Sequence, residues 1–344
     1  MTPAPLLWSP RTATRRSLAG DAVCLFALEA SRALGEAVAR ALGVTLSAHE
    51  ERSFEDGEHK TRPLVSVRGR SVFVVQSLHG GPSESANDKL CRLLFFIGAL
   101  KDAGARQVTA VVPYLCYARK DRRTKPGDPV TTRYSAALFE AVGTDAIITL
   151  DVHNPAAFEN AFRCRSIALT AAPLFVDYAR TMKGAPLSVV SPDPGGVKRA
   201  ELFREALEGA LGAPVGKGFV DKHRSAGVVS GDLFVGEAKN AIVLILDDLV
   251  STGHTLLRAA RAVRAAGAAR VVALATHGLF MTGADEALAD PALDRVVVTD
   301  AVPPFRLKSG AAKDKLDILP CAPLLAEAIF RLHQGQPTDY LLAF

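Results

Sequence analysis

The sequence lacks the features that mark membrane spans, disulfide scaffolds and the common nucleotide-binding loops. Its five cysteines are scattered, odd in number and include no C-x-x-C pair, which favours free thiols in a reducing cytoplasm over disulfides or a zinc site. No apolar stretch approaches the roughly 20 residues of a membrane span, and no signal-type apolar core follows Arg15 and Arg16. Neither a Walker A loop nor a G-x-G-x-x-G turn occurs.

The bulk composition predicts sizeable buried cores and about two domains. The chain has 344 residues, of which 49% are apolar and 22% charged. Its formal net charge of +5 suits anionic substrates and is too small to indicate nucleic acid. Five basic residues crowd between positions 119 and 125, but only Tyr114 and Tyr117 accompany them, which argues against single-strand nucleic-acid binding. This run is either a solvated face or a triphosphate site.

Strand-like apolar runs alternate with helical runs, which predicts a mostly parallel sheet flanked by helices. Two successive segments also recur. Residues 99–114, ALKDAGARQVTAVVPY, match residues 262–277, AVRAAGAARVVALATH, and residues 145–155 match residues 294–304. The reuse of Ala-Gly turns among α/β proteins is one explanation, but matched order over two strands is hard to obtain by chance. We therefore expect two related domains, and domain interfaces favour ligand clefts.

The most informative segment is residues 242–257, IVLILDDLVSTGHTLL. An apolar run leads into Asp247 and Asp248, a short turn follows, and a helix-forming run begins; this predicts a buried strand, a tight loop and a helix N-terminus. Backbone N–H groups at such a helix start bind phosphate, and paired carboxylates bind sugar hydroxyls or a metal ion. The segment thus indicates a phosphorylated sugar, the alternative being an acid pair that only caps the helix.

Three further clusters carry groups suited to phosphate chemistry. Asp151 and His153 follow an apolar strand and point the same way on an extended segment, so they can hold a hard metal. Asp193 stands at a strand end before a pair of glycines, which allow close approach of a ligand to the backbone. Residues 221–224, DKHR, precede a glycine-rich segment, and basic groups on a mobile loop can neutralise a transferring phosphoryl group. Taken singly, each cluster also fits an ordinary turn or surface charge.

Taken together, these segments resemble the ribose-phosphate pyrophosphokinase family. The resemblance spans roughly residues 22–331, and the motifs occur in the family's order. They are FEDGE at 54–58, ND at 87–88, PYLCYARKDR at 113–122, DVH at 151–153, SPDPGG at 191–196, KHR at 222–224 and DDLVSTGHT at 247–255. So many ordered motifs are specific to this family, and the separate explanations above lose most of their weight.

The resemblance implies transfer of the diphosphoryl group of ATP to the C1 hydroxyl of ribose 5-phosphate (EC 2.7.6.1). The products are phosphoribosyl pyrophosphate (PRPP), for nucleotide biosynthesis, and AMP. It also implies Mg²⁺ as cofactor, two tandem phosphoribosyltransferase-type (type I) α/β domains, and a homo-oligomer built from dimers, up to a hexamer. No nucleic-acid or membrane partner is expected. The alternatives are a non-catalytic regulatory relative and a phosphoribosyltransferase; retention of Lys222 and Arg224 disfavours both.

The resemblance also implies a role for each motif. Lys222 and Arg224 stabilise charge on the β-phosphoryl oxygens, and His153 and Asp193 contact the metal. The residues implied to bind ATP are Phe54, Asp56, Gly57, Glu58, Arg119, Lys120 and Asp121. The residues implied to bind ribose 5-phosphate are Asp247, Asp248, Ser251, Thr252, Gly253, His254 and Thr255.

The expected domains follow from the same motifs. Residues 1–20 form an N-terminal extension. Residues 21–165 form the ATP-side domain, which the C-terminal helix within residues 321–344 completes. Residues 166–320 form the ribose 5-phosphate side.

Several positions depart from the common family pattern. His223 replaces an arginine in the catalytic loop, and Lys120 replaces a glutamine. Ser251 stands where aspartate is frequent, which is a mild change. His254 replaces a glycine, and such a position can require positive φ, which histidine tolerates better than most residues.

Overall fold

The computed structural model describes residues 18, 23–225, 228–308 and 310–342, with the backbone alone for residues 222–225, 228–232 and 340. Within this part, the chain forms two compact units. The first unit runs up to Thr170 and resumes at Cys321, and the second unit is Ala171–Pro320. The expected extension at residues 1–20 lies, apart from Leu18, outside the described residues. Among the described helices, none combines the length and the apolar character needed to cross a membrane.

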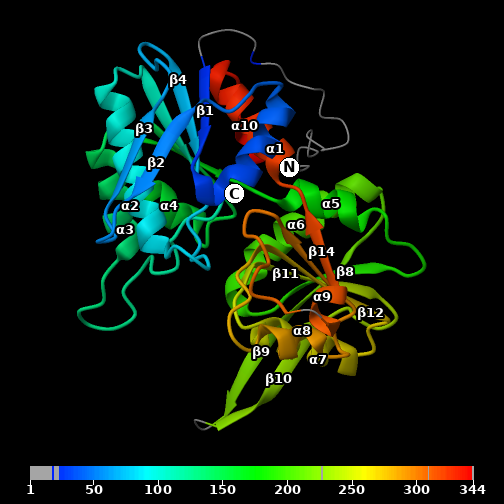
Figure 1. Cartoon of the computed structure of the whole chain (residues 1–344). Helices are drawn as coiled ribbons and strands as arrows, with labels where there is room; N and C mark the ends of the chain where they lie inside the picture. The colour runs from blue at the N-terminus through cyan, green and yellow to red at the C-terminus, as the bar shows by residue number, and fades with distance from the viewer. Residues whose placement is uncertain (1–17, 19–22, 226–227, 309, 343–344) are drawn as a thin grey trace. The chain divides into compact units, whose positions relative to one another are not determined.

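The first unit is built on a parallel five-stranded sheet in the order β1-β4-β5-β6-β7 (Figure 1). The strands are β1 (Val23–Ala27), β4 (Ser71–Val75), β5 (Gln107–Val111), β6 (Ala146–Leu150) and β7 (Arg165–Leu169), with a separate antiparallel pair β2 (His49–Ser53) and β3 (His59–Pro63). The helices are α1 (Arg32–Leu42), α2 (Ala86–Asp102), α3 (Thr131–Ala141), α4 (Pro155–Ala161) and α10 (Ala322–His333), with 3-10 turns η1 (Glu29–Ser31) and η3 (Asp339–Leu341). Strands β4 and β6 are buried along their whole length, as parallel strands covered on both faces are.

The limits of the first unit follow from strand pairing and helix packing. Strand β7 pairs in parallel with β6 from Arg165 to Leu169, so this unit extends beyond residue 165, where the sequence placed the boundary. Helix α10 packs against α1, which brings the end of the chain into this unit. Apolar side chains of the sheet and of α2, such as Phe26 and Phe96, form the core.

The second unit is built on a seven-stranded sheet in the order β10-β9-β8-β11-β12-β13-β14, in which β9 and β10 form an antiparallel hairpin and the other neighbours are parallel. The strands are β8 (Leu187–Ser191), β9 (Gly216–Ser225), β10 (Val228–Gly236), β11 (Ile242–Val250), β12 (Arg270–Gly278), β13 (Arg295–Thr299) and β14 (Leu316–Leu319). The helices are α5 (Ala172–Ala179), α6 (Val197–Leu211), α7 (His254–Ala265), α8 (Ala284–Ala289) and α9 (Ala311–Asp314), with the 3-10 turn η2 (Pro194–Gly196). The β9–β10 hairpin extends away from the rest of the unit (Figure 1).

The two sheets repeat one topology. Strands β1, β4, β5, β6 and β7 of the first unit follow the same order as β8, β11, β12, β13 and β14 of the second, and each unit inserts an antiparallel hairpin between its first two parallel strands. The acids matched in the sequence also make matching contacts. Asp145 accepts from the Val108 N–H at 2.7 Å and from Lys101, and Asp294 accepts from the Val271 N–H at 2.6 Å and from Arg264. These two acids are therefore structural.

Candidate active site

The loop between β11 and α7 has the form that the sequence predicts. Strand β11 is buried through Leu246 and carries Asp247 and Asp248 near its end, and α7 begins at His254. The positive φ of this loop, +78°, belongs to Gly253, the residue before the helix. Positive φ occurs at four of the described non-glycine residues, and His254 is not one of them. The expected strain at His254 is therefore absent, because the neighbouring glycine adopts the left-handed conformation.

The start of α7 presents an environment suited to an anion. The first N–H groups of any α-helix have no partner within the helix, and the helix dipole places partial positive charge there. Thr252 and His254 add side-chain groups: Nδ1 of the exposed His254 lies 2.9 Å from Oγ1 of Thr252. This combination of backbone N–H groups, hydroxyls and an imidazole suits a phosphate dianion.

Replacement of Gly253 tests this loop. A Cβ there would lie 3.0 Å from the Cβ of Ala287, and alanine at φ +78° costs about 1–2 kcal/mol. We expect Gly253→Ala to destabilise the protein by about that amount and to weaken ribose 5-phosphate binding. The measurements are thermal unfolding and calorimetric titration with ribose 5-phosphate. Gly209→Ala is the matched control: Gly209 lies within α6 with no atom near its Cβ position, so alanine should stabilise the helix. Equal effects of both changes would contradict this account of the loop.

The two adjacent acids on β11 form an electrostatically strained pair. Asp248 is only 4% exposed, and its backbone N–H donates to Oδ1 of Asp247 at 2.8 Å. Burial, followed by the negative charge of Asp248, raises the pKa of the Asp247 carboxyl well above its usual range. Asp247 and Asp248 repel each other when both are ionised. A cation, or a ligand whose hydroxyl groups donate hydrogen bonds to the carboxylates, reduces this repulsion, so the pair favours binding of such a ligand.

Arg199 is a residue of this site that sequence reasoning missed. It lies in the first turn of α6, and its Nη1 is 3.8 Å from Oδ1 of Asp247 and 3.6 Å from Oδ1 of Asp248. Its charge lowers the pKa of Asp247 and so opposes the larger effects of burial and of Asp248. Asp193 precedes the same helix, and its Oδ1 accepts from the Gly196 N–H at 3.1 Å. The first turn of α6 thus brings a guanidinium to the acid pair, and Asp193 lies in the segment between β8 and the same helix.

The residues implied to be catalytic lie on the β9–β10 hairpin. In the backbone register, Lys222 pairs with Asp232 and Arg224 pairs with Val229, and the register shifts between these two pairs. The side chains of Lys222 and Arg224 lie outside the described part of the chain. The backbone therefore places both residues on one hairpin of the second unit.

In the first unit, the segment implied to bind adenosine forms an exposed hairpin turn. Residues 54–58 join β2 to β3, and the Phe54 N–H donates to the Glu58 carbonyl at 2.8 Å. Oδ1 of Asp56 accepts from the Glu58 N–H at 3.0 Å, and Gly57 has φ +92°. The Arg52 guanidinium lies 5.0 Å from the centre of the Phe54 ring. The turn therefore presents an accessible aromatic face beside polar groups.

The basic segment, residues 119–125, is fixed at several points within the first unit. Oδ2 of Asp128 accepts from Lys120 Nζ at 2.5 Å, from the Thr124 N–H at 2.9 Å and from the Lys125 N–H at 2.9 Å. These partners hold the pKa of Asp128 well below its usual range, with Lys120 the largest cause. The segment is thus a folded loop that exposes its remaining basic side chains.

The basic segment is also tied to the loop that carries His153. Nδ2 of Asn154 donates to Oδ2 of Asp121 at 2.6 Å. The structure therefore brings together two motifs that are well apart in the sequence, one implied to bind ATP and one implied to bind metal. Sequence reasoning missed Asn154, although an asparagine before a proline at a helix start is a recognisable cap signal.

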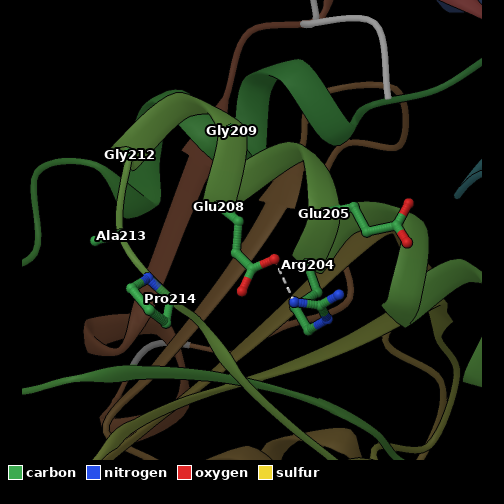
Figure 2. Close-up of a pocket in the computed structure, with 7 residues that line it drawn as sticks. All are labelled: Arg204, Glu205, Glu208, Gly209, Gly212, Ala213 and Pro214. Atoms are coloured by element: carbon green, nitrogen blue, oxygen red, sulfur yellow. Dashed lines mark ion pairs between the residues drawn. The ribbon is translucent and has the colours of Figure 1, made fainter. Parts of the chain in front are cut away.

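A surface hollow of about 510 Å³ lies at the end of α6 opposite Arg199. Its lining consists of Arg204, Glu205, Glu208, Gly209, Gly212, Ala213 and Pro214. Figure 2 shows the Glu208 carboxylate facing Arg204 across one turn of the helix, and the two groups pair at 2.5 Å. Arg204 also pairs with Glu201 at 2.8 Å, so its charge is already compensated. The hollow includes none of the residues implied to be functional.

Comparison with known proteins places the chain. Residues 23–143 match the model of the N-terminal domain of ribose phosphate pyrophosphokinase, and residues 232–343 match that of the phosphoribosyl synthetase-associated domain. A ribose-phosphate pyrophosphokinase of Caldanaerobacter subterraneus subsp. tengcongensis is 37% identical over 310 residues, covering 90% of this chain and 94% of the relative. The chain belongs to the ribose-phosphate pyrophosphokinase family.

Two further members of the ribose-phosphate pyrophosphokinase family agree with this placement. Ribose-phosphate pyrophosphokinase 1 of Streptococcus pneumoniae is 35% identical over 92% of this chain and 96% of its own length. The crystal structure of phosphoribosylpyrophosphate synthetase from Mycobacterium smegmatis superposes with a TM-score of 0.80 at 32% identity, covering 91% of this chain and 99% of that one. The predicted family and α/β phosphoribosyltransferase-type fold are confirmed, and the chain is a ribose-phosphate diphosphokinase.

Proposed function

We propose that the chain forms PRPP and AMP from ATP and ribose 5-phosphate, with the β11–α7 loop as its ribose 5-phosphate site. The observation that carries this proposal is the strained acid pair beside the start of α7. Residues 251–255 bind the 5-phosphate through backbone N–H and hydroxyl groups. Asp247 and Asp248 accept hydrogen bonds from the ribose hydroxyls. A sugar phosphate satisfies both groups at once, which neither phosphate nor sugar alone does.

We assign the ATP side to the first unit. Arg119 and Lys120 contact the triphosphate, and the exposed turn at residues 54–58 contacts the adenosine. The C1 hydroxyl oxygen of ribose 5-phosphate attacks the β-phosphorus of ATP, the bond from that phosphorus to the α-phosphate oxygen breaks, and AMP leaves. Lys222 and Arg224 stabilise the charge that develops on the β-phosphoryl oxygens. Catalysis then consists of positioning and electrostatics, without a covalent nucleophile.

The proposed cofactor is Mg²⁺, and the resemblance implies a metal contact for His153 of the first unit and for Asp193 of the second. Magnesium sites in nucleotide enzymes combine one or two carboxylates with substrate phosphates and water, rather than a complete protein cage. Among the described residues, no group of three or more His, Cys, Asp or Glu side chains is arranged to hold a metal ion. When bound with ATP, the ion supplies neutralisation of phosphate charge.

The direct test is formation of AMP. We expect purified protein with ATP, ribose 5-phosphate and Mg²⁺ to release AMP in equal amount to PRPP, and EDTA to abolish the reaction. Absence of AMP across a screen of metals and phosphate concentrations would contradict the proposal and favour the regulatory relative. Consumption of PRPP with a nucleobase, releasing pyrophosphate, would favour the phosphoribosyltransferase.

We further propose a cytoplasmic homo-oligomer built from dimers. The five cysteines are all free, which is typical of a reducing compartment. The first unit exposes apolar side chains that a subunit interface could bury. Phe95 is 60% exposed and Leu64 is 52% exposed. Sedimentation velocity measures the size of the assembly, and a monomer at all concentrations would contradict the proposal.

A further inference from the structure

We propose that Asp121 and Asn154 form a positioning pair that holds the basic segment against the loop of His153. The inference deepens the proposed function and rests on it. Asn154 directly follows His153, and its Nδ2 donates to the Asp121 carboxylate at 2.6 Å. Its other side-chain atom, Oδ1, accepts from the Ala157 N–H at 3.2 Å and so caps α4. One side chain therefore fixes both the helix start and the basic segment.

The chemistry of Asp121 suits positioning better than contact with ATP. A carboxylate next to a triphosphate is repelled by the phosphate oxygens unless a cation lies between them. Here one carboxylate oxygen is already bound to an amide N–H group, and hydrogen bonds to ionised acceptors are short and strong. Asp121 thus anchors the segment, while the neighbouring Arg119 is exposed and is proposed to contact the phosphates.

The surrounding backbone shows why such an anchor is needed. Tyr117, two residues before Arg119, has φ +61°, and Asp151, two residues before His153, has φ +40°. Left-handed non-glycine residues persist only where the surroundings hold them. Thr132 Oγ1 donates to the Tyr117 carbonyl at 3.0 Å, which fixes the chain just before the basic segment to α3. The Asp121–Asn154 bond ties the other side of the segment to the loop between β6 and α4.

A swap of the two side chains tests the pair. Asn154→Asp keeps the cap, since aspartate caps helices as well as asparagine, but it sets two carboxylates against each other. We expect it to raise the KM for ATP roughly tenfold and to leave the KM for ribose 5-phosphate within about twofold. The double variant Asp121→Asn, Asn154→Asp restores one donor and one acceptor with unchanged net charge. It should recover the KM for ATP to within about threefold of the original.

Two further variants make the outcome decisive. Asp121→Asn alone can rotate its amide to accept from Asn154, so its KM for ATP should rise less than that of Asn154→Asp. Asn154→Ser keeps a capping oxygen and removes the amide donor, so it should weaken ATP binding without a large change in thermal stability. A severe effect of Asp121→Asn that the double variant does not rescue would overturn the inference and make Asp121 a direct ligand.

The failure of this inference is distinguishable from the failure of the proposed function. If the original protein forms no AMP, the proposed function fails, whichever variants are compared. Binding of a non-hydrolysable ATP analogue, measured by calorimetry on the same variants, still reports on the pair. Loss of affinity in Asn154→Asp with recovery in the double variant supports the positioning pair, and equal affinity in all variants refutes it.

Discussion

Lys222→Ala is expected to lower turnover on the order of 100-fold while the KM for ATP changes by less than about threefold. The reason is that Lys222 is assigned to charge that appears on the β-phosphoryl oxygens only as the bond to AMP breaks. An interaction made mainly in the transition state affects kcat, whereas one made equally in the ground state affects KM. Steady-state rates of AMP formation at varied ATP and saturating ribose 5-phosphate give both constants.

Lys217→Ala is the matched control for this prediction. Lys217 lies on the same strand, β9, with its side chain 68% exposed and its Nζ 3.7 Å from the Glu201 carboxylate. Exposed ion pairs contribute little, so turnover should stay within about twofold of the original. Unchanged turnover in Lys222→Ala would show that the hairpin does not carry the catalytic charge. A raised KM for ATP with unchanged kcat would instead place Lys222 in ground-state binding of ATP.

The repeated topology could be predicted from the sequence because the signals that mark the end of a strand are local. The apolar runs before Asp151 and Asp247 mark buried parallel strands, and the recurrence of Asp145 at Asp294 marks a repeated contact. In the structure, Asp145 and Asp294 make the same hydrogen bonds. Each accepts one from a backbone N–H at the start of the preceding strand and one from a basic side chain at a helix end. A contact that occurs twice leaves a recurring set of residues, and the sequence shows this recurrence.

The residues that sequence reasoning missed contact partners that no sequence pattern marks. Arg199 reaches Asp247 and Asp248 from another helix, and Asn154 reaches Asp121 from another loop. No spacing rule links such pairs, because only the fold decides which loops meet at one sheet edge. Pairing of β7 with β6 carries the first unit past residue 165, and such pairing depends on the sheet rather than on composition.

The repeat also locates two of the sets of residues to which the family resemblance gives a role, one in adenosine binding and one in stabilising phosphoryl charge. In each unit the antiparallel hairpin inserted between the first two parallel strands carries one set: residues 54–58 follow β2, and Lys222 and Arg224 lie on β9. Only β9 joins its sheet, by pairing in parallel with β8, whereas β2 and β3 pair with each other alone. The same insertion point in the two sheets therefore carries residues to which the resemblance gives different roles, adenosine binding at residues 54–58 and charge stabilisation at Lys222 and Arg224.

Asp247→Asn is expected to stabilise the free protein and to abolish most of its activity. In the folded protein, burial and Asp248 raise the pKa of Asp247 to about 8, from an ordinary value of 3.8. Between these pH values the folded state holds more protons than the unfolded state, so the free energy of unfolding falls as pH rises. Asparagine does not titrate and so removes this decrease. We expect the free energy of unfolding of Asp247→Asn to exceed that of the original protein by on the order of 2 kcal/mol at about pH 8, and by less towards about pH 5. Thermal unfolding of both proteins across this window measures the gain.

Asp290→Asn is the control, because its carboxyl has the opposite shift. The Ala292 N–H and Arg261 lower the pKa of Asp290, so its contribution is present above the ordinary pKa and is lost only as pH falls. Its replacement should destabilise the protein by a similar amount at about pH 5 and about pH 8. A stability gain in Asp247→Asn that does not grow with pH would show that the acid pair is not under electrostatic strain.

The activity of Asp247→Asn distinguishes a role in ligand binding from a role in folding. Above about pH 8, where Asp247 is ionised, replacing the carboxylate by an amide loses a hydrogen bond to a charged group. Such a loss costs about 1.5–3 kcal/mol, which predicts a decrease of roughly 10- to 150-fold in kcat/KM for ribose 5-phosphate at that pH. A residue kept for folding would lose stability when replaced, whereas a residue kept for ligand binding gains stability and loses activity. A gain in stability together with a loss of activity would identify the acid pair as part of the ribose 5-phosphate site. Retained activity would show that Asp247 does not contact the substrate.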